Sequence, residues 1–325
     1  MLNFIEIIRG IGILAVILVH TTAIGVSTEN DFIRYLNIVL GQFSGFAVPI
    51  FIMVSGYVLS ISNFGNLNTK KQIKFFYIKR IKKILIPYAF FSSIFIILHI
   101  PFGHFWFFNL ILYLYFLYPI LNLKILNPII TLVCLIFCAY SLEYFLYFSG
   151  LSINPIFHPK YILYMWMGIL LYRNEKIIYK WIEKYSFFLM FIYIVILIIQ
   201  TTWTFLYSNN YLYIEIWATL SLTSISIILF LIFYFVAKGY IPLRFQEKLS
   251  FFGELSFGIY IIHIVFLGVT KLLLLQVTTK DNILVYMVVF IVSLIGSIIF
   301  TQILREFKLG RYVLSMQASI RGKNN

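Results

Sequence analysis

Hydrophobic residues run through this chain in stretches of membrane-crossing length, separated by short polar segments. A helix needs about 20 predominantly apolar residues to cross a bilayer, and backbone groups in lipid must be satisfied within their own segment. The pattern therefore predicts an all-α polytopic transmembrane bundle of about ten spans, without the alternation of barrel strands. The predicted spans are 4–24, 38–61, 84–101, 105–122, 127–148, 159–173, 185–206, 213–236, 252–275 and 283–304.

One membrane domain accounts for nearly all of the sequence. We predict a transmembrane domain over 1–305 and a basic cytoplasmic tail over 306–325. The N-terminus does not have the pattern of a cleavable signal peptide, so 4–24 is predicted to be a retained span. With no separate soluble domain predicted, any chemistry is expected among the membrane helices or at their mouths.

Composition and charge placement agree with a membrane protein. Hydrophobic residues make up 62% of the chain and charged residues 11%, against about 25% charged in soluble domains. The net charge of +14 comes from basic stretches at 70–83, 173–184, 238–248 and 305–323. With both termini in the cytoplasm, these stretches face inward and obey the positive-inside rule. The basic excess therefore indicates anionic lipid at the inner surface of the plasma membrane, and no nucleic acid.

The chain has two cysteines, Cys134 and Cys138, four positions apart in an apolar run. We expect them to pack as small apolar side chains and to form neither a disulfide nor a metal site. No clustered spacing of His, Cys or Asp indicates a metal elsewhere.

The first span keeps three ionisable residues, Glu6, Arg9 and His20. At 100° per residue they share one helix face, with Arg9 and His20 about 16 Å apart along the axis. Charged side chains in a membrane are costly and usually mark a functional path. The stripe therefore favours a protected polar path, with Arg9 toward the cytoplasm and His20 toward the outer face. A buried Glu6–Arg9 pair with a separately hydrogen-bonded His20 is the structural alternative.

Five segments, in order, resemble the membrane acyltransferase-3 family of O-acyltransferases. The first is the Arg9–His20 pair, with ten residues between them and Glu6 at −3. The others are "FAVPIFIMVSGYVLS" (46–60), "FFYIKRIKKILIPY" (75–88), "HFWFFNLILYLYFLYP" (104–119) and "LSFGIYIIH" (255–263). The resemblance implies transfer of an acyl group, acetyl or alternatively succinyl, from cytoplasmic acyl-CoA to a hydroxyl of an extracytoplasmic or lipid-linked glycan. It implies acyl-CoA as co-substrate with no permanently bound cofactor, a bacterial plasma-membrane location, and glycan-synthesis or export proteins as partners.

The first span then takes specific roles in such a reaction. Arg9 would hold a phosphate or pantetheine carbonyl of CoA, and Glu6 would orient or neutralise Arg9. His20 would act as general base on the acceptor hydroxyl, because imidazole titrates near neutral pH. An acyl-His intermediate is the alternative to direct transfer. Both side chains are expected to open into one shared cavity.

The basic segment before the third span is the expected site of the CoA phosphates. Arg80 and Lys83 stand at the inner mouth just before Pro87, which bends or begins a helix there. This segment is arginine-rich in the family but mostly lysine here, and lysine binds phosphate without a bidentate fork. Anchoring of the third span by these cations is the alternative interpretation.

Two later segments supply candidate substrate-binding residues. Ser256, Tyr260 and His263 share a face of the span 252–275. His263 could bind the acyl carbonyl or complete a tunnel wall, and hydrogen bonding between helices by a buried histidine is its alternative role. Trp106 belongs to an aromatic belt or stacks on a sugar ring; His104 lies at the same outer mouth.

A transporter gives a second hypothesis for the same pattern. A proton-coupled transporter or flippase that exports a polysaccharide or lipid-linked sugar would also use intramembrane ionisable residues. Transporters often show paired repeats with broken helices, and no such pair is evident in the sequence. A membrane sensor or scaffold would not require the aligned trio Glu6, Arg9 and His20.

Overall fold

The computed structural model describes residues 2–62, 67, 69–100, 103–123, 127–149, 157–207, 212–279 and 282–315. Within these ranges every regular element is helical and no strand is present. The prediction of an all-α fold is confirmed for this part of the chain.

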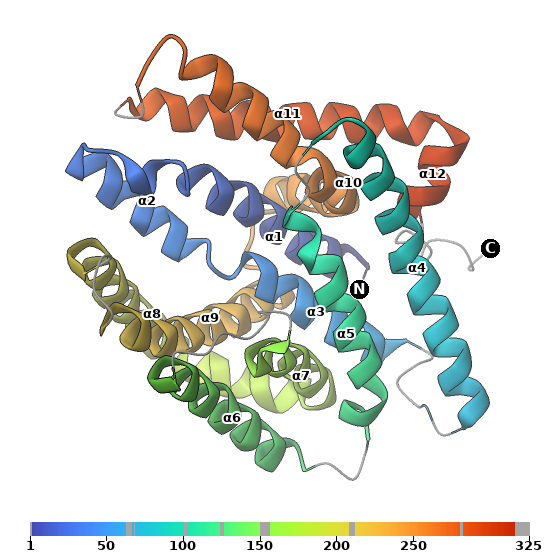
Figure 1. Ribbon diagram of the computed structural model, residues 1–325. Coiled ribbons are helices and arrows are strands. Elements are labelled where there is room, and N and C mark those ends of the chain that lie inside the picture. The colour runs from blue at the N-terminus through green and yellow to red at the C-terminus, as the bar shows by residue number, and fades with distance from the viewer. Residues whose placement is uncertain are drawn as a thin grey trace.

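The helices surround α1, which contacts α2, α3, α9, α10 and α11. Figure 1 shows α1 between the α10–α11 pair and α3, with α4 at one edge of the molecule. The bounds are α1 (Leu2–Thr22), η1 (Gly25–Ser27), α2 (Asp31–Phe43), α3 (Ala47–Ile61), α4 (Lys70–Ile97), η3 (Gly103–Phe105), α5 (Trp106–Leu121), α6 (Pro128–Ser149), α7 (Pro159–Arg173), α8 (Glu175–Tyr207), α9 (Leu212–Ala237), α10 (Leu243–Leu274), α11 (Ile283–Glu306) and α12 (Lys308–Ser315), where η marks a 3-10 helix.

Within the described residues, six helical segments are long and apolar enough to cross a membrane, so the protein is a multi-pass membrane protein. They are Phe4–Thr22, Asp31–Ile61, Gly103–Leu121, Glu175–Leu206, Leu243–Leu274 and Ile283–Glu306. Two shorter apolar helical segments are Ile130–Leu142 and Thr223–Ala237. Each predicted span overlaps at least one helix, but ten crossings and cytoplasmic termini stay predictions.

The predicted second span is two helices. α2 ends at Phe43, and α3 begins at Ala47. The Ser44 hydroxyl donates to the Leu40 carbonyl at 2.8 Å and so satisfies a backbone group at the end of α2. Pro49 is the third residue of α3, where its missing N–H costs no intrahelical bond.

The basic segment and the predicted third span form one continuous helix, α4. Thr69 and Gln72 form a capping box at its start, with side-chain to backbone bonds of 3.0 and 3.2 Å. The helix continues through Pro87 to Ile97, so the expectation that a helix could begin at Pro87 is wrong. Enough helical turns flank Pro87 on both sides to tolerate the single backbone bond that it removes.

Glycines let two helix pairs approach closely. A Cβ on Gly10 of α1 would meet the Leu249 carbonyl of α10, and one on Gly253 of α10 would meet the Glu6 carbonyl of α1. Gly56 and Gly168 join α3 and α7 in the same reciprocal way. Small residues at such crossings are typical of packed membrane helices, and they fix α10 directly against α1.

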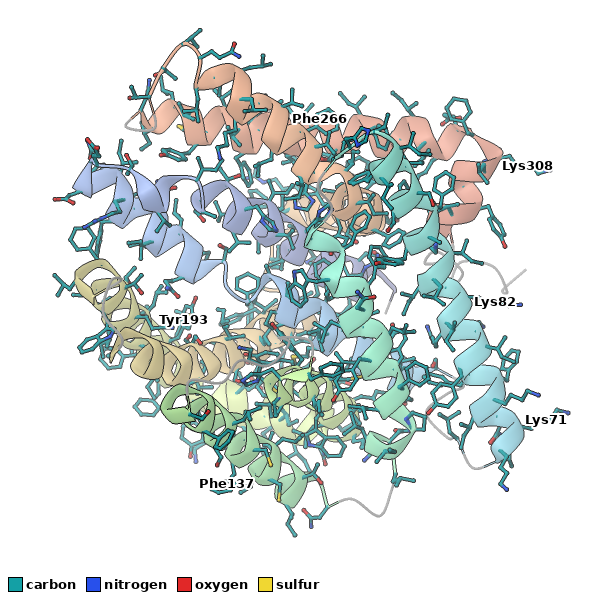
Figure 2. All side chains as sticks on the ribbon, in the orientation of Figure 1. Lys71, Lys82, Phe137, Tyr193, Phe266 and Lys308 are labelled. Carbon is teal, nitrogen blue, oxygen red and sulfur yellow. The ribbon has the colours of Figure 1, made fainter. Side chains whose placement is uncertain are left out.

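Large apolar side chains cover much of the outer surface. Phe137 on α6 is 70% exposed and Phe187 on α8 is 83% exposed; Figure 2 shows Phe137 at the rim of the molecule. Such a surface suits contact with lipid. Cys134 and Cys138 are free and exposed as well, so the expectation that they pack inside is wrong: these positions of α6 face outward.

The predicted tail begins with a short amphipathic helix. α12 folds back onto α11 and contacts α4. Val313 and Leu314 are buried, while Lys308 and Arg311 are exposed. Residues 316–325 of the predicted tail lie outside the described residues.

Candidate active site

Arg9 is held by groups from two helices. Its Nη1 donates to both carboxylate oxygens of Glu6 at 3.1 Å, one helical turn away on α1. Its Nη2 donates to Ser256 Oγ of α10 at 2.9 Å. The side chain is only 14% exposed. Charge-assisted bonds in two directions fix the plane of the guanidinium.

Two cations of α4, Arg80 and Lys83, lie near Arg9. The Arg80 guanidinium lies 5.9 Å from the ring centre of Phe76 and 5.6 Å from that of Tyr115. Aromatic faces attract a cation without neutralising it. The two rings therefore help to hold the Arg80 side chain at this position.

Lys83 precedes the predicted span 84–101 by one residue. Burial, together with the positive charges of Arg80, Arg9 and Lys79, lowers the pKa of Lys83 to about 7. A bound anion would reverse this trend, because an opposite charge favours the protonated amine. The cluster is therefore suited to an anionic ligand.

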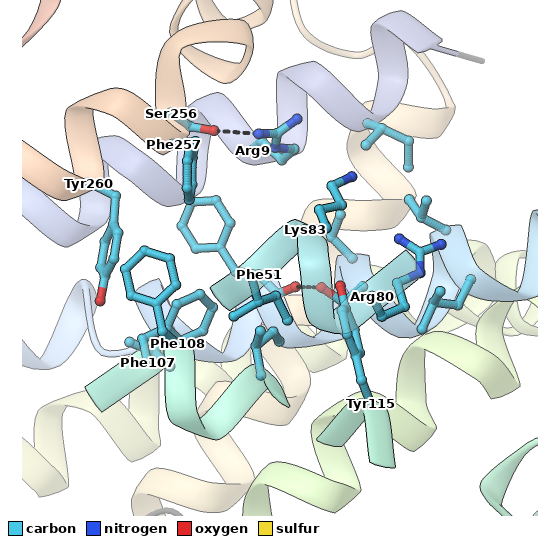
Figure 3. A pocket seen from close by; sticks show the side chains of 18 of the residues that line it. Arg9, Phe51, Arg80, Lys83, Phe107, Phe108, Tyr115, Ser256, Phe257 and Tyr260 are labelled. Atoms are coloured by element: carbon cyan, nitrogen blue, oxygen red, sulfur yellow. Dashed lines mark hydrogen bonds between the residues drawn. The ribbon is translucent and has the colours of Figure 1, made fainter. Parts of the chain in front are cut away.

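These cations line a cavity of about 150 Å³, which we call the inner cavity. Figure 3 shows Arg9, Lys83 and Arg80 toward one side of it, and Phe107, Phe108 and Tyr260 toward the other. Among its described lining residues, Arg9, Arg80 and Lys83 outnumber the single carboxylate, Glu6. The rest of the lining is largely apolar. The cavity can accept a group that is anionic at one end and apolar along its length.

Three imidazoles meet about one turn beyond this cavity. His20 of α1 and His263 of α10 have ring centres 5.2 Å apart. His104 of η3 lies 5.6 Å from His263, ring centre to ring centre. The Tyr260 hydroxyl donates to the backbone carbonyl of His104 and ties η3 to α10. We call His20, His104 and His263 the histidine cluster.

The inner cavity does not reach His20, so it is not by itself the shared cavity that the sequence predicts. Along α1 its lining ends at Val16, one helical turn before His20. The aromatic rings of Phe107, Phe108 and Tyr260 occupy this end; Phe107 lies 5.6 Å and Phe108 5.9 Å from Tyr260. Aromatic packing therefore separates the cations from the histidine cluster.

A second cavity of about 470 Å³ lies beyond the cluster and is called the outer cavity here. Val19 and Ala23, which flank His20 on α1, line it, and Val48 lines both cavities. Its polar lining residues are Thr22, Asn37, Gln42, Ser44, Tyr140, His158, Lys160, Tyr161, Tyr164, Gln200, Thr204, Ser221 and Ser224, with Trp106 among the aromatic ones. The mixture of amides, hydroxyls and aromatic rings, together with Lys160, suits a polar ligand.

Part of this lining is a buried polar network. Ser224 donates to Gln200 Oε1 at 3.0 Å, and Gln42 donates to Thr204 Oγ1 at 3.3 Å. Gln200 is 2% exposed, and its Nε2 has no protein partner in the described part of the chain. A buried donor without a partner costs free energy, so a ligand that accepts this bond would stabilise the site.

Trp106 lies between two hollows of the structure. It lines the outer cavity and also a more open hollow of about 710 Å³ beside Tyr88 and His99. Its ring centre is 5.9 Å from that of Tyr161. The structure thus offers a pair of aromatic rings at this edge, as a sugar-stacking surface requires.

The three predicted residues of α10, Ser256, Tyr260 and His263, do not all line the same cavity. Ser256 and Tyr260 line the inner cavity, whereas His263 is fully buried and lines neither the inner nor the outer cavity. Direct contact of His263 with an acyl carbonyl therefore stays a prediction that neither cavity supports. Its contacts are with other side chains and with backbone carbonyls.

The sequence predicts His104 only at an outer mouth, and it does not predict the outer cavity. The contact of His104 with His263 depends on how η3 meets α10, which the sequence does not show. Gln200 and Thr204 carried a usable signal: two polar residues four positions apart within the apolar span 185–206. Polar side chains in a span usually face the interior of the protein.

No group of three or more His, Cys, Asp or Glu side chains among the described residues could hold a metal ion. The three imidazoles of the histidine cluster are therefore not arranged as metal ligands.

The comparison with protein families decides the chain's membership. The acyltransferase-3 family model, described as "Acyltransferase domain", matches residues 2–302. The chain belongs to the acyltransferase-3 family. No curated protein and no solved structure matches it.

Both cavities and the histidine cluster lie within residues 2–302, the part of the chain that the acyltransferase-3 family model matches. The chain is thus a multi-pass membrane acyltransferase.

Proposed function

We propose that this acyltransferase moves an acyl group from cytoplasmic acyl-CoA to a hydroxyl of an extracytoplasmic or lipid-linked glycan. Acetyl is the expected group and succinyl the alternative. One observation carries the proposal: α1 runs from a cationic cavity to an imidazole, and a polar cavity follows beyond it.

The donor binds at the cationic end of the inner cavity. Arg9, Arg80 and Lys83 hold the CoA phosphates or the pantetheine carbonyls, since all three line one cavity. Glu6 and Ser256 orient Arg9 through the bonds described above. The apolar lining beyond them accommodates the thin pantetheine arm and the acyl thioester.

The transfer takes place at His20. The acceptor hydroxyl gives its proton to His20 as its oxygen forms a bond to the thioester carbonyl carbon. The carbon–sulfur bond then breaks, and the CoA sulfur takes the proton from His20. This sequence regenerates His20 and needs no other reactant.

The aromatic rings between cavity and cluster act as a gate in this scheme. Phe107, Phe108 and Tyr260 separate the inner cavity from His20. Rotation of these rings would open a passage for the thioester. Closure would keep water from the thioester when no acceptor is bound.

The acceptor enters the outer cavity. Amide and hydroxyl groups there match sugar hydroxyls, and Trp106 with Tyr161 provides a surface for stacking. With the N-terminus in the cytoplasm, this cavity faces outward from a bacterial plasma membrane. Glycan-synthesis or export proteins would deliver the acceptor.

The test is reconstitution. The purified chain in proteoliposomes receives isotope-labelled acetyl-CoA and surface glycan from cells that lack the gene, and mass spectrometry follows the label. We expect labelled ester on the glycan with the wild type. His20→Ala should lower the rate by about two to four orders of magnitude, the usual contribution of a positioned base.

A matched control and a contrary outcome complete this test. Arg311→Ala, on the exposed face of α12, should leave the rate unchanged. Equal rates in wild type and His20→Ala would overturn the proposal. Movement of unmodified glycan across the membrane, with no ester formed, would favour the transporter hypothesis instead.

A further inference from the structure

The hydrogen bonds of His263 determine which of its nitrogens carries a proton. Nδ1 lies 2.7 Å from the Tyr260 carbonyl oxygen and 3.2 Å from that of Ile259. A carbonyl oxygen only accepts, so Nδ1 carries the hydrogen. Nε2 of the neutral ring is then a bare acceptor, and it is buried without a protein partner among the described residues.

The same reasoning applies to His104. Its Nε2 lies 3.1 Å from the Ile261 carbonyl oxygen and therefore carries the hydrogen. Its Nδ1 is a buried acceptor that no described group satisfies. The histidine cluster thus contains two acceptor nitrogens that lack a hydrogen.

His20 can supply one hydrogen to this pair. It makes no hydrogen bond to another described protein group, and its ring centre is 5.2 Å from that of His263. No hydrogen bond joins the two rings as they lie in the structure, but this separation fits one N–H···N bond of about 3 Å once the rings turn toward each other. The His104 ring packs against the ring of His263. The acceptor that we assign to His20 is therefore Nε2 of His263.

We propose that His263 is a positioning residue for His20: its bare Nε2 accepts one N–H of His20 and leaves the other His20 nitrogen bare. That nitrogen then faces the acceptor hydroxyl as a base. The second hydrogen bond of an imidazole sets its tautomer in this way, as a carboxylate does for the histidine of hydrolase triads. The inference rests on the proposed function of His20.

The bond from His20 to His263 can persist through every step of the reaction. When His20 gains the proton of the hydroxyl, the bond to His263 becomes charge-assisted and stronger. The proton on the other nitrogen passes to the departing CoA sulfur, and His263 keeps its own hydrogen on the backbone carbonyls throughout. The titratable side chains that face the cluster from α1, η3 and α10 are His20, His104, Tyr260 and His263.

The test compares two substitutions of similar length. His263→Gln keeps an acceptor oxygen near the place of Nε2, while His263→Met has no strong acceptor. In the reconstituted assay, His263→Met should lower kcat by about a hundredfold, the order expected for a misoriented base. His263→Gln should retain at least a tenth of the wild-type kcat. The KM for acetyl-CoA should stay within about twofold of wild type for both.

Leu267→Met, one turn along α10, is the control for inserting methionine into this buried surface and should keep full activity. Full activity of a folded His263→Met would overturn the inference, as would equal losses in folded Met and Gln variants. If the wild type transfers no acyl group, the proposed function itself has failed. If His20→Ala is inactive but His263→Met is not, only the positioning role has failed.

A measurement on the wild type keeps the inference testable if His263→Met does not fold. Solid-state NMR of the ¹⁵N-histidine-labelled protein in bilayers distinguishes the two neutral tautomers of each ring. The His263 signal, assigned by its loss in His263→Gln, should report hydrogen on Nδ1 and none on Nε2. Hydrogen on Nε2 would overturn the proposal.

Discussion

Only part of the environment of Arg9 follows from the local sequence. Its pair with Glu6 depends only on the three-residue spacing along α1. Its bond to Ser256 joins positions 247 residues apart, and only the contact of α1 with α10 creates it. Arginine suits this position because its planar fork donates in two directions at once, which a lysine ammonium cannot do in the same geometry.

We therefore predict that Arg9→Lys weakens donor binding more than chemistry. The KM for acyl-CoA should rise about tenfold, as for loss of a charge-assisted bond, while kcat falls by no more than about threefold. Initial rates against acyl-CoA concentration measure both. Arg311→Lys, on the exposed face of α12, is the control and should change neither. An unchanged KM in Arg9→Lys would remove Arg9 from the donor site.

At the scale of elements, the α1–α10 pair is the support for the whole site. α10 makes its close approach to α1 through Gly10 and Gly253. The same contact brings Ser256 to Arg9 and His263 to His20. Displacement of one helix by a side chain at the crossing would disturb both ends of the site together.

Two glycines on α10 test this directly. Gly253→Ala places a Cβ against the Glu6 carbonyl, and overpacking of this kind costs about 1–3 kcal/mol. Gly268→Ala meets nothing within 4 Å and should stabilise by up to about 1 kcal/mol through helix propensity. Thermal unfolding in detergent should therefore show a lower midpoint for Gly253→Ala and an unchanged or higher one for Gly268→Ala. The reverse order would contradict the close packing.

At the scale of the whole molecule, lysines of α4 and α12 lie on the same side. Figure 2 shows Lys71, Lys82 and Lys308 on the side formed by α4 and α12. The positive-inside rule predicts that this side faces the cytoplasm. The proposed function requires this orientation, with Arg9 toward the source of acyl-CoA and the outer cavity toward the glycan. The direction of acyl transfer therefore depends on the orientation of the chain in the membrane.

Single cysteines report this orientation. In a background of Cys134→Ala and Cys138→Ala, we predict that Lys71→Cys reacts with a membrane-impermeant maleimide in inverted vesicles and not in intact cells. Glu29→Cys, in the connection after α1, should show the opposite pattern. Labelling is measured by the mass shift on a gel. The converse pattern at both positions would invert the topology and place the outer cavity in the cytoplasm.

The sequence by itself determined the helices, their membrane-grade hydrophobicity and the shared face of Glu6, Arg9 and His20. These features are local, because a helix repeats every 3.6 residues and a bilayer sets a minimum apolar length. The ordered segments around them also indicated the acyltransferase-3 family, which the match over 2–302 confirmed.

Tertiary structure alone decided what those residues meet. It bonded Arg9 to Ser256, placed His104 beside His263, separated the inner cavity from His20 and formed the outer cavity. Helix periodicity says which face a residue occupies but not which helix will cover that face. That choice depends on packing between segments far apart in the chain, where glycines at the crossings and the volumes of aromatic rings set the distances.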